Sequence, residues 1–229
     1  KSQLGIYTFA YSLGSSIFFF YGSVGTYFEP LVYKFSADKK KYHAILKFYL
    51  TFVLMCASLF SIAILIGTKY FAFHFISEDY LSGFTVLPIV LGAHLMMPFY
   101  HISNYELTVL NKTAFIAFST IGSAILNILL NIFFIPKWGI TGAAFSTLLT
   151  YIFLALAGNA WAIKASGISR NYLKYIAILF LFVNAAVLYA NFMIHELWLA
   201  SGGLFALFIV LSVLSIRQMP TLKMTINTL

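Results

Sequence analysis

The strongest constraint on this chain is a pair of apolar runs, at about 114–135 and 139–163, separated only by the sequence PKWG. Proline has no N–H to donate and disfavours continuation of a helix, so we expect the first run to end before Pro136. Lysine and tryptophan in such a linker are typical of a membrane–water boundary. The second run opens on small residues that share one helix face and allow close helix approach in lipid: Gly142, Ser146 and Thr150. The segment predicts a tight transmembrane hairpin.

Polar residues repeat every four positions in the first arm of this hairpin, so they also share one helix face. The repeat consists of Ser119, Ser123, Asn127 and Asn131. Side chains of these types hydrogen-bond between helices in membranes. We interpret Asn127 and Asn131 as helix-packing residues that face the second arm, and we interpret the lone Asn184 in a later run in the same way.

The composition places the whole chain in a membrane. Hydrophobic residues make up 62% of the sequence and charged residues only 9%, with a mean hydropathy of +0.93. Soluble domains contain roughly 25% charged residues. The net charge of +8 is better explained by juxtamembrane lysines near anionic lipid than by nucleic acid. The single Cys56 excludes an intrachain disulfide.

Apolar runs long enough to cross a bilayer occur repeatedly, since a spanning helix needs about 20 such residues. We predict an all-α integral membrane protein, a polytopic bundle of about seven transmembrane helices in a single membrane domain. The predicted spans are about 5–33, 44–68, 82–110, 114–135, 139–163, 172–193 and 196–216.

The positively charged residues predict the orientation of these spans. Three of the 14 lie at one set of helix ends: Lys1, Lys69 and Lys137. The other eleven lie at the opposite ends, which the positive-inside rule places in the cytoplasm. We therefore expect a cytoplasmic C-terminus and an outer N-terminus. An outer N-terminus without a signal peptide indicates that further helices precede Lys1, so we interpret the chain as a fragment.

Glu29 is a candidate site residue in the first predicted span. It follows Gly25 by four positions and Gly22 by seven, so it shares their helix face. Acids within membrane helices usually face an interior or a wet cavity. The alternative is that Glu29 lies one turn from Lys34 and simply reaches the cytoplasmic headgroups.

The third predicted span carries two histidines and two prolines. His94, Pro98, His101 and Tyr105 fall near one line on a regular helix, and proline favours a kink there. A histidine at mid-membrane beside a helix break is a candidate protonation or substrate site. The alternative is a neutral histidine bonded to a neighbouring helix. We expect no metal site, because no Cys, Asp or Glu completes a ligand set.

Enzyme motifs are missing from the sequence. It contains no Gly-rich phosphate loop and no nucleophile-plus-base motif. The predicted outer loops are too short to hold the acids or arginines of a membrane polymerase. We therefore expect neither catalysis nor a cofactor, and a transport function is the interpretation that remains.

Three stretches resemble a known family. The segment NIFFIPKWGITGAAFSTLLTY at 131–151 resembles a stretch that recurs near the end of Wzx-type polysaccharide flippases. These flippases belong to the superfamily of MATE exporters and of the lipid II flippase MurJ. GIYTFAYSL with YFEPLVYKF, and TVLNKTAF at 108–115, are similar to the preceding helices of the same family.

The resemblance implies the C-terminal lobe of a two-lobed flippase in the bacterial inner membrane. Such a protein moves polyprenyl-diphosphate-linked oligosaccharide for O-antigen, capsule or exopolysaccharide by alternating access, coupled to H+ or Na+. Its partners are this lipid-linked substrate, membrane lipids and the missing N-terminal lobe. By analogy, the first candidates for residues that line the cavity are Tyr21, Tyr27 and Glu29. The second candidates are His94, His101 and Tyr105. The predicted spans contain no arginine, although such cavities are usually cationic.

Two other functions are consistent with the same residues. A MATE-like exporter of small cations would use an acid such as Glu29 as its binder. A membrane scaffold without transport activity is the second alternative.

The predicted orientation can be tested with single cysteines. In a Cys56→Ser background, Lys40→Cys and Lys137→Cys place one thiol on each predicted side. An impermeant thiol reagent applied outside is expected to label residue 137 and to spare residue 40. The reverse labelling pattern would overturn the orientation.

Overall fold

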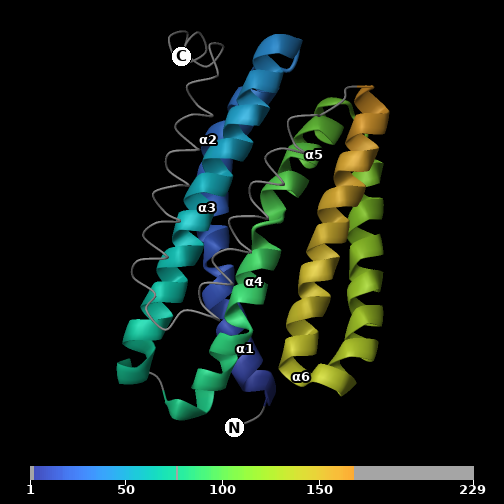
Figure 1. Ribbon diagram of the computed structural model, residues 1–229. Coiled ribbons are helices and arrows are strands. Elements are labelled where there is room, and N and C mark those ends of the chain that lie inside the picture. Colours follow the sequence, from blue (N-terminus) through green and yellow to red (C-terminus); the bar gives the residue numbers. More distant parts are fainter. Residues whose placement is uncertain (1–2, 76, 168–229) are drawn as a thin grey trace. The chain divides into compact units, whose positions relative to one another are not determined.

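The computed structural model describes residues 3–75 and 77–167, and over these ranges it is helical and contains no strand (Figure 1). The chain divides into two units. Unit 1 contains Lys1–Gly22 and Phe60–Ile168, and unit 2 contains Ser23–Leu59 and Ser169–Leu229. The elements are α1 (Gln3–Ser15), α2 (Ile17–Lys34), α3 (Lys39–Phe75), the 3-10 helix η1 (Glu78–Thr85), α4 (Leu87–His94), α5 (Met97–Val109) and α6 (Thr113–Ser166).

Three helical stretches are long and apolar enough to cross a membrane. They are Gln3–Lys34, Lys39–Leu65 and Thr113–Ser166. This is the architecture expected of a membrane protein, whose spans need about 20 apolar residues each. The predicted spans at 172–193 and 196–216, and with them Asn184, lie outside the described residues.

Two of the predicted spans are interrupted. The stretch expected at 5–33 is divided at Ser16, and the stretch expected at 82–110 is divided into η1, α4 and α5. Serine side chains compete for backbone hydrogen bonds. Here Ser16 Oγ donates to the Leu13 carbonyl at 2.6 Å. In the second stretch Pro88 and Pro98 each occupy the first turn of a new helix, the position that tolerates proline best.

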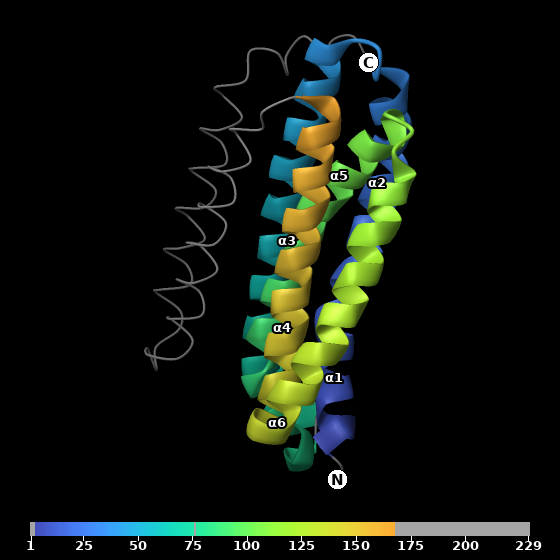
Figure 2. The same ribbon diagram turned by 90° about the vertical axis from the view of Figure 1, so that its right-hand side faces the viewer.

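Helix α6 is a hairpin whose two arms run side by side in both ribbon views (Figures 1 and 2). We expected the first arm to end before Pro136, but helical backbone continues through it, and Gly139 is the residue with non-helical dihedral angles (φ 55°, ψ −131°). A proline costs one hydrogen bond, whereas a positive φ strains any residue with a side chain. The reversal therefore occurs at the glycine. Three residues later, a Cβ atom at Gly142 would collide with the Phe134 carbonyl, so the chain passes very close to itself.

An asparagine side chain in the first arm bonds to the second arm, and a second asparagine bonds to the first one. Asn127 Nδ2 donates to Thr150 Oγ1 at 3.1 Å, and Asn131 Nδ2 donates to Asn127 Oδ1 at 2.9 Å. Ser119 and Ser123 are buried, and each donates to the carbonyl four residues earlier in its own helix. The polar row thus lies along the inside of the hairpin.

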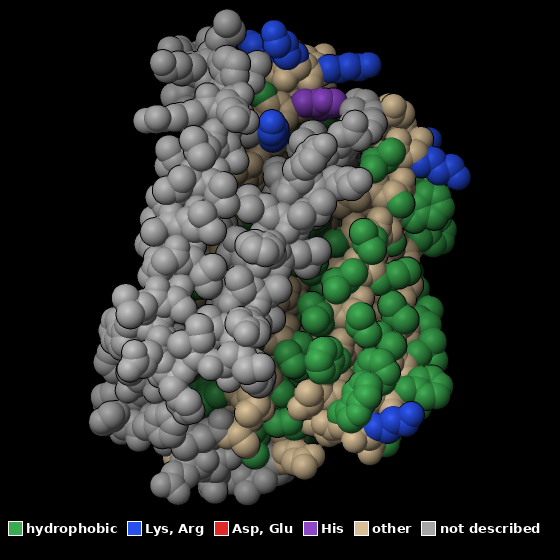
Figure 3. All heavy atoms as spheres, in the orientation of Figure 1, with side chains coloured by type: hydrophobic (Ala, Val, Ile, Leu, Met, Phe, Trp, Pro, Cys, Tyr) green, Lys and Arg blue, Asp and Glu red, His purple; other side chains and the backbone are tan. Residues whose placement is uncertain are grey.

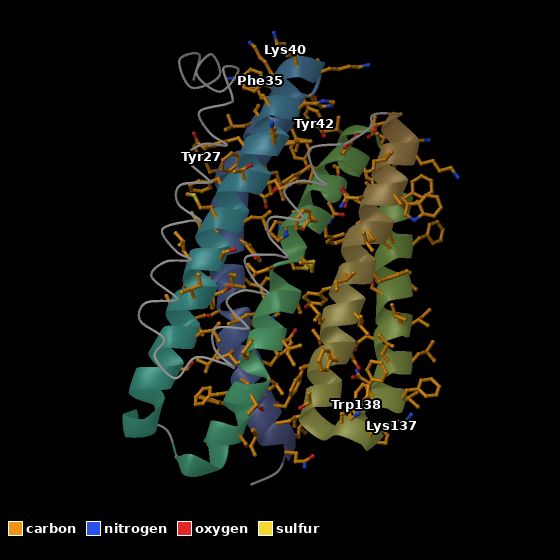
Figure 4. The ribbon with its side chains drawn as sticks, in the orientation of Figure 1. Tyr27, Phe35, Lys40, Tyr42, Lys137 and Trp138 are labelled. Atoms are coloured by element: carbon orange, nitrogen blue, oxygen red, sulfur yellow. The ribbon has the colours of Figure 1, made fainter. Side chains whose placement is uncertain are left out.

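The outer face of the hairpin is apolar. Hydrophobic side chains gather over α6 in the space-filling view (Figure 3), and Phe118, Ile128 and Leu156 are each at least 60% exposed. Lys137 and Trp138 lie at the turn (Figure 4). One arm, of about 26 residues, is about 39 Å long. This length matches a bilayer of about 30 Å of hydrocarbon plus its interfaces.

The open ends of the two arms carry a second aromatic and basic group. The rings of Phe115 and Trp161 stack at 4.5 Å between centroids. Lys164 Nζ lies 5.5 Å from the centre of the Trp161 ring. Tryptophan and lysine concentrate where a membrane helix meets headgroups. Each end of the hairpin is therefore marked by a Trp–Lys pair.

Helix α5 packs against α6 and is hydrogen-bonded to it. Asn159 Nδ2 donates to the Phe99 carbonyl at 2.8 Å, and Tyr100 OH hydrogen-bonds to Thr120 Oγ1 at 2.7 Å. Gly158 makes room for Ser103, whose Oγ would lie 2.5 Å from a Cβ at that position. Close approach through small residues is a common way to pack membrane helices. Helix α5 and the hairpin therefore form one packed body.

In unit 2, the second part of α2 packs against the first part of α3 through aromatic rings. The ring of Phe28 lies 5.6 Å from that of Phe48 and 5.4 Å from that of Tyr49. Tyr49 is fully buried, and Phe28 is nearly so. The Phe28–Phe48 pair is tilted and the Phe28–Tyr49 pair is edge-to-face, and aromatic contacts add to the packing energy.

The two glycines of the α6 turn give a test of the hairpin. Gly139→Ala forces a side chain into a positive φ, and Gly142→Ala places a methyl group on the Phe134 carbonyl. Each substitution is expected to destabilise the protein by roughly 1–3 kcal/mol. The measurement is thermal unfolding in detergent, followed by circular dichroism.

The matched control is Gly122→Ala in the first arm. A Cβ there would meet the Phe153 ring at 3.6 Å, an ordinary van der Waals distance. This variant is expected to melt no lower than the wild type, since alanine is the better helix former. Equal melting of Gly142→Ala and Gly122→Ala would contradict the close approach at the turn.

Candidate functional site

Two helix interruptions face each other in unit 1. Helix α1 ends at Ser15 and α2 begins at Ile17, while α4 ends at His94 and α5 begins at Met97. At the second interruption, Met96 N–H donates to the Ala93 carbonyl at 3.0 Å, which is a tighter turn than an α-helix makes. The two interruptions are joined by hydrogen bonds to His94, the residue around which the site is built.

The imidazole of His94 is fully buried at the end of α4. Its Nε2 atom hydrogen-bonds to Ser15 Oγ at 3.2 Å. Three aromatic rings surround it: Phe18 at 4.7 Å, Tyr11 at 5.4 Å and Tyr151 at 5.6 Å between ring centroids. Its Nδ1 atom is buried and has no hydrogen-bond partner among the residues that the structure describes. Buried polar atoms nearly always have a partner, so this nitrogen is an exception that calls for an explanation.

The carbonyl of His94 is bonded from another helix. In a regular helix its donor would be the N–H four residues later, but that residue is Pro98, which has none. Tyr21 OH donates to this carbonyl instead, at 3.1 Å. Tyr21 is itself 3% exposed, and its ring also meets His101 edge-on at 5.8 Å. The proline thus leaves an acceptor without its helical donor, and Tyr21 replaces that donor.

Glycine allows α1 to reach α4 at this level. A Cβ atom at Gly14 would lie 2.7 Å from Val90 Cγ1 and 3.5 Å from His94 Cδ2. The first of these distances is too short for real atoms, so one helix would have to move. Gly14 therefore sets the separation that lets Ser15 bond to His94.

Three residues of α1, spaced four apart, form a polar ladder: Tyr7, Tyr11 and Ser15. Tyr7 OH hydrogen-bonds to Thr147 Oγ1 at 3.2 Å, and Tyr11 OH to Tyr151 OH at 3.3 Å, both on α6. Ser15 then bonds to His94 on α4. Residues four apart share a helix face, so one face of α1 supplies the whole ladder.

The structure places the predicted site residues in two groups. Tyr21, His94 and His101 come together in unit 1, and Tyr105 is half-buried in α5. Tyr27 and Glu29 belong to unit 2, where Tyr27 is 61% exposed. Glu29 is also exposed, and it accepts a hydrogen bond from Tyr33 OH at 3.2 Å.

Four residues of unit 1 were missed as site candidates. Tyr11, Ser15 and Tyr151 contact His94, and the spacing of Tyr7, Tyr11 and Ser15 was the signal for two of them. Glu106 is the fourth, an acid in α5 that is only 3% exposed. An ionisable residue inside a predicted span is itself the signal that should have identified it.

The chemistry of this cluster is that of a polar binding site with aromatic walls. An imidazole, phenols and hydroxyls can donate and accept hydrogen bonds, and the imidazole can take up a proton. The Ser15–His94 pair resembles a nucleophile with its base. In a catalytic triad a third group holds the other ring nitrogen, and within the described residues His94 Nδ1 has no such partner. In residues 3–75 and 77–167 no three of His, Cys, Asp and Glu are grouped to hold a metal.

No family model, curated protein or solved structure is found to match this chain.

The bond between Tyr21 and the His94 carbonyl can be measured by a double-mutant cycle. Tyr21→Phe is expected to lower the free energy of unfolding by about 1–3 kcal/mol, because it leaves a buried carbonyl without a donor. Pro98→Ala restores an N–H at the helical position. The double variant Tyr21→Phe/Pro98→Ala should therefore lose less than the sum of the two single variants, as measured by thermal unfolding in detergent.

Tyr27→Phe serves as the control, because this tyrosine is exposed and lies in unit 2. Its effect is expected to stay within about 0.5 kcal/mol of the wild type. Strict additivity of Tyr21→Phe and Pro98→Ala would show that the tyrosine does not replace the missing helical donor.

Proposed function

We propose that this chain is one lobe of a membrane transporter that moves polyprenyl-diphosphate-linked oligosaccharide across the bacterial inner membrane. In this proposal the lobe has about seven spans, its C-terminus is cytoplasmic and it works with an N-terminal lobe. The motif resemblance at 131–151 supports the substrate class. The geometry of unit 1 supports a transporter in general.

The observation that carries the proposal is the meeting of two interrupted helices at a buried histidine. Transporters build binding sites from discontinuous helices, because broken backbone is tolerated within a membrane only inside protein or beside a cavity. Here Ser15 and Tyr21, on either side of the first interruption, both bond to His94 at the second. A bundle that needed only to be stable would gain nothing from two such interruptions.

The hydrogen bonds at these interruptions are few and individually weak. Each is worth about 1 kcal/mol net, so a ligand with a modest preference for an open state could exchange them. Helix α5 is fastened to α6 by Asn159 and Tyr100, whereas α4 ends at the turn before it. We propose that the turn at Leu95–Met96 is the hinge of the lobe.

Within this mechanism, His94 and His101 meet the substrate or the coupling ion when the hinge opens. The Nδ1 atom of His94 has no hydrogen-bond partner among the described residues, so it is available for that contact. Tyr21 and Tyr105 are further candidates for substrate contact in unit 1, and Tyr27 and Glu29 are separate candidates within unit 2. H+ or Na+ supplies the driving force.

A second candidate is an exporter of small organic cations, and Glu106 favours it. Its carboxylate is only 3% exposed within α5, and ionisable groups within membrane helices often mark the path of a substrate or an ion. The two candidates differ in what accumulates when the protein is removed. Loss of the flippase leaves lipid-linked glycan on the cytoplasmic side, whereas loss of the exporter increases sensitivity to cationic dyes.

The experiment is His94→Ala in the chromosomal copy of the gene. We expect transport per molecule to fall at least about tenfold, the effect of losing a contact of about 1.4 kcal/mol in the transport cycle. The measurements are the accumulation of polyprenyl-diphosphate-linked glycan and the abundance of the protein in the membrane.

Tyr100→Phe is the matched control. It removes the 2.7 Å hydrogen bond between Tyr100 of α5 and Thr120 of α6. Transport in this variant should fall only as far as its abundance falls. If transport and abundance also fell together in His94→Ala, the histidine would be a packing residue and the proposed site would be wrong.

A further inference from the structure

The turn between α2 and α3 concentrates positive charge. Residues 29–47 contain five lysines and two acids, which gives a formal net charge of +3. Lys34 is the last residue of α2, and Lys39 to Lys41 open α3. All four of these lysines are exposed. The turn belongs to unit 2 and lies between two of the stretches that can cross a membrane.

Backbone hydrogen bonds hold this turn in one shape. Phe35 N–H donates to the Leu31 carbonyl at 3.1 Å, and Asp38 N–H donates to the Phe35 carbonyl at 3.1 Å. Asp38 Oδ1 accepts from the N–H groups of Lys40 and Lys41, each at 3.1 Å, and so caps the start of α3. One of the two acids is thus engaged in capping, and the lysine side chains around it are displayed from a fixed backbone.

Two of the lysines converge on one aromatic ring. Lys34 Nζ lies 5.3 Å from the centre of the Phe35 ring, and Lys41 Nζ lies 5.4 Å from it. Both distances are in the range of cation–π contacts. Two ammonium groups from different helices would normally repel each other. Because both distances are measured to the same ring centroid, the two ammonium nitrogens lie no more than about 11 Å apart.

We propose that the α2–α3 turn binds the phosphate of an anionic phospholipid between Lys34 and Lys41. Phe35 forms the floor of this site and lies at the boundary between headgroups and acyl chains. Phe35 and Lys40 are found at the same end of the two helices (Figure 4). Aromatic rings are enriched at that depth of a bilayer, and basic clusters next to a span attract anionic lipid.

A lipid is favoured over a free phosphate by where the turn lies. Both flanking helices are apolar over lengths sufficient to cross a bilayer, so the turn is held at headgroup level. A phospholipid bound there also keeps its acyl chains in contact with the helices. This inference does not depend on the proposed transport function, because it concerns unit 2 alone and is measured as binding.

The test compares two double variants that remove the same charge from the same turn. Lys34→Gln/Lys41→Gln removes the pair over Phe35, and Lys39→Gln/Lys40→Gln removes two neighbouring lysines. The purified chain in detergent is titrated with dioleoyl-phosphatidylglycerol and followed by native mass spectrometry. The first variant is expected to bind the first lipid about thirtyfold more weakly than the wild type, and the second less than about fivefold.

Further arms identify the ligand and the fold of the variants. Dioleoyl-phosphatidylcholine and glycerol 3-phosphate should both bind more weakly than phosphatidylglycerol, because one lacks net charge and the other lacks acyl chains. Lys34→Arg/Lys41→Arg keeps both charges and is expected to bind at least as tightly as the wild type. Unchanged circular dichroism spectra are expected for every variant, since these side chains are exposed.

Three results would overturn the proposal. Equal weakening in the two Gln variants would show a general surface charge instead of a site. Equal binding of glycerol 3-phosphate and phosphatidylglycerol would make the ligand a free phosphate. Complete displacement of phosphatidylglycerol by an equimolar amount of farnesyl diphosphate would assign the turn to a diphosphate-linked substrate.

Discussion

A backbone group freed by a helix break has no water to bond with in the middle of a bilayer, so the protein must supply the partner. The contact between Tyr21 and the His94 carbonyl is the clearest case in this structure. Pro98 removes the helical donor, and a phenol from another helix takes its place. This requires α1 and α2 to lie close to α4, and Gly14 permits that approach because it has no side chain to meet Val90. The polar ladder of α1 adds side-chain hydrogen bonds along the helix, from Tyr7 and Tyr11 to α6 and from Ser15 to α4.

The same arrangement explains why the candidate site lies where it does. Interrupting α4 and α5 turns the imidazole of His94 inward, among the rings of Tyr11, Phe18 and Tyr151. The hydroxyls of Tyr11, Ser15 and Tyr21 are each hydrogen-bonded, but the Nδ1 atom of His94 is not bonded to any residue that the structure describes. In the proposed transporter this nitrogen binds a proton or a polar ligand. In the same proposal, the turn that precedes α5 is the hinge, and α5 itself stays packed on α6.

Sequence patterns predicted the helical class and the α6 hairpin, because long apolar runs and small-residue spacing are local properties. They were less able to predict where helices break. Ser16 resembles the serines around it, and only the structure shows that its hydroxyl bonds to the Leu13 carbonyl. Pro136 looked like the end of an arm, yet the reversal is at Gly139, where the backbone needs a positive φ. Ser15 and His94 are 79 residues apart in the sequence, and a local sequence pattern cannot predict such a long-range contact. Glu106 was visible as an acid within an apolar run and was overlooked beside the histidines.

The asparagines inside the α6 hairpin have a consequence for how the chain enters the bilayer. Asn127 is bonded to Thr150, which is synthesised later. A first arm released alone into hydrocarbon would carry Asn127 without that partner, at a cost that the finished pair does not have. Releasing the two arms together therefore costs less free energy than releasing the first arm alone. The short turn at Gly139 keeps the arms next to each other for this step.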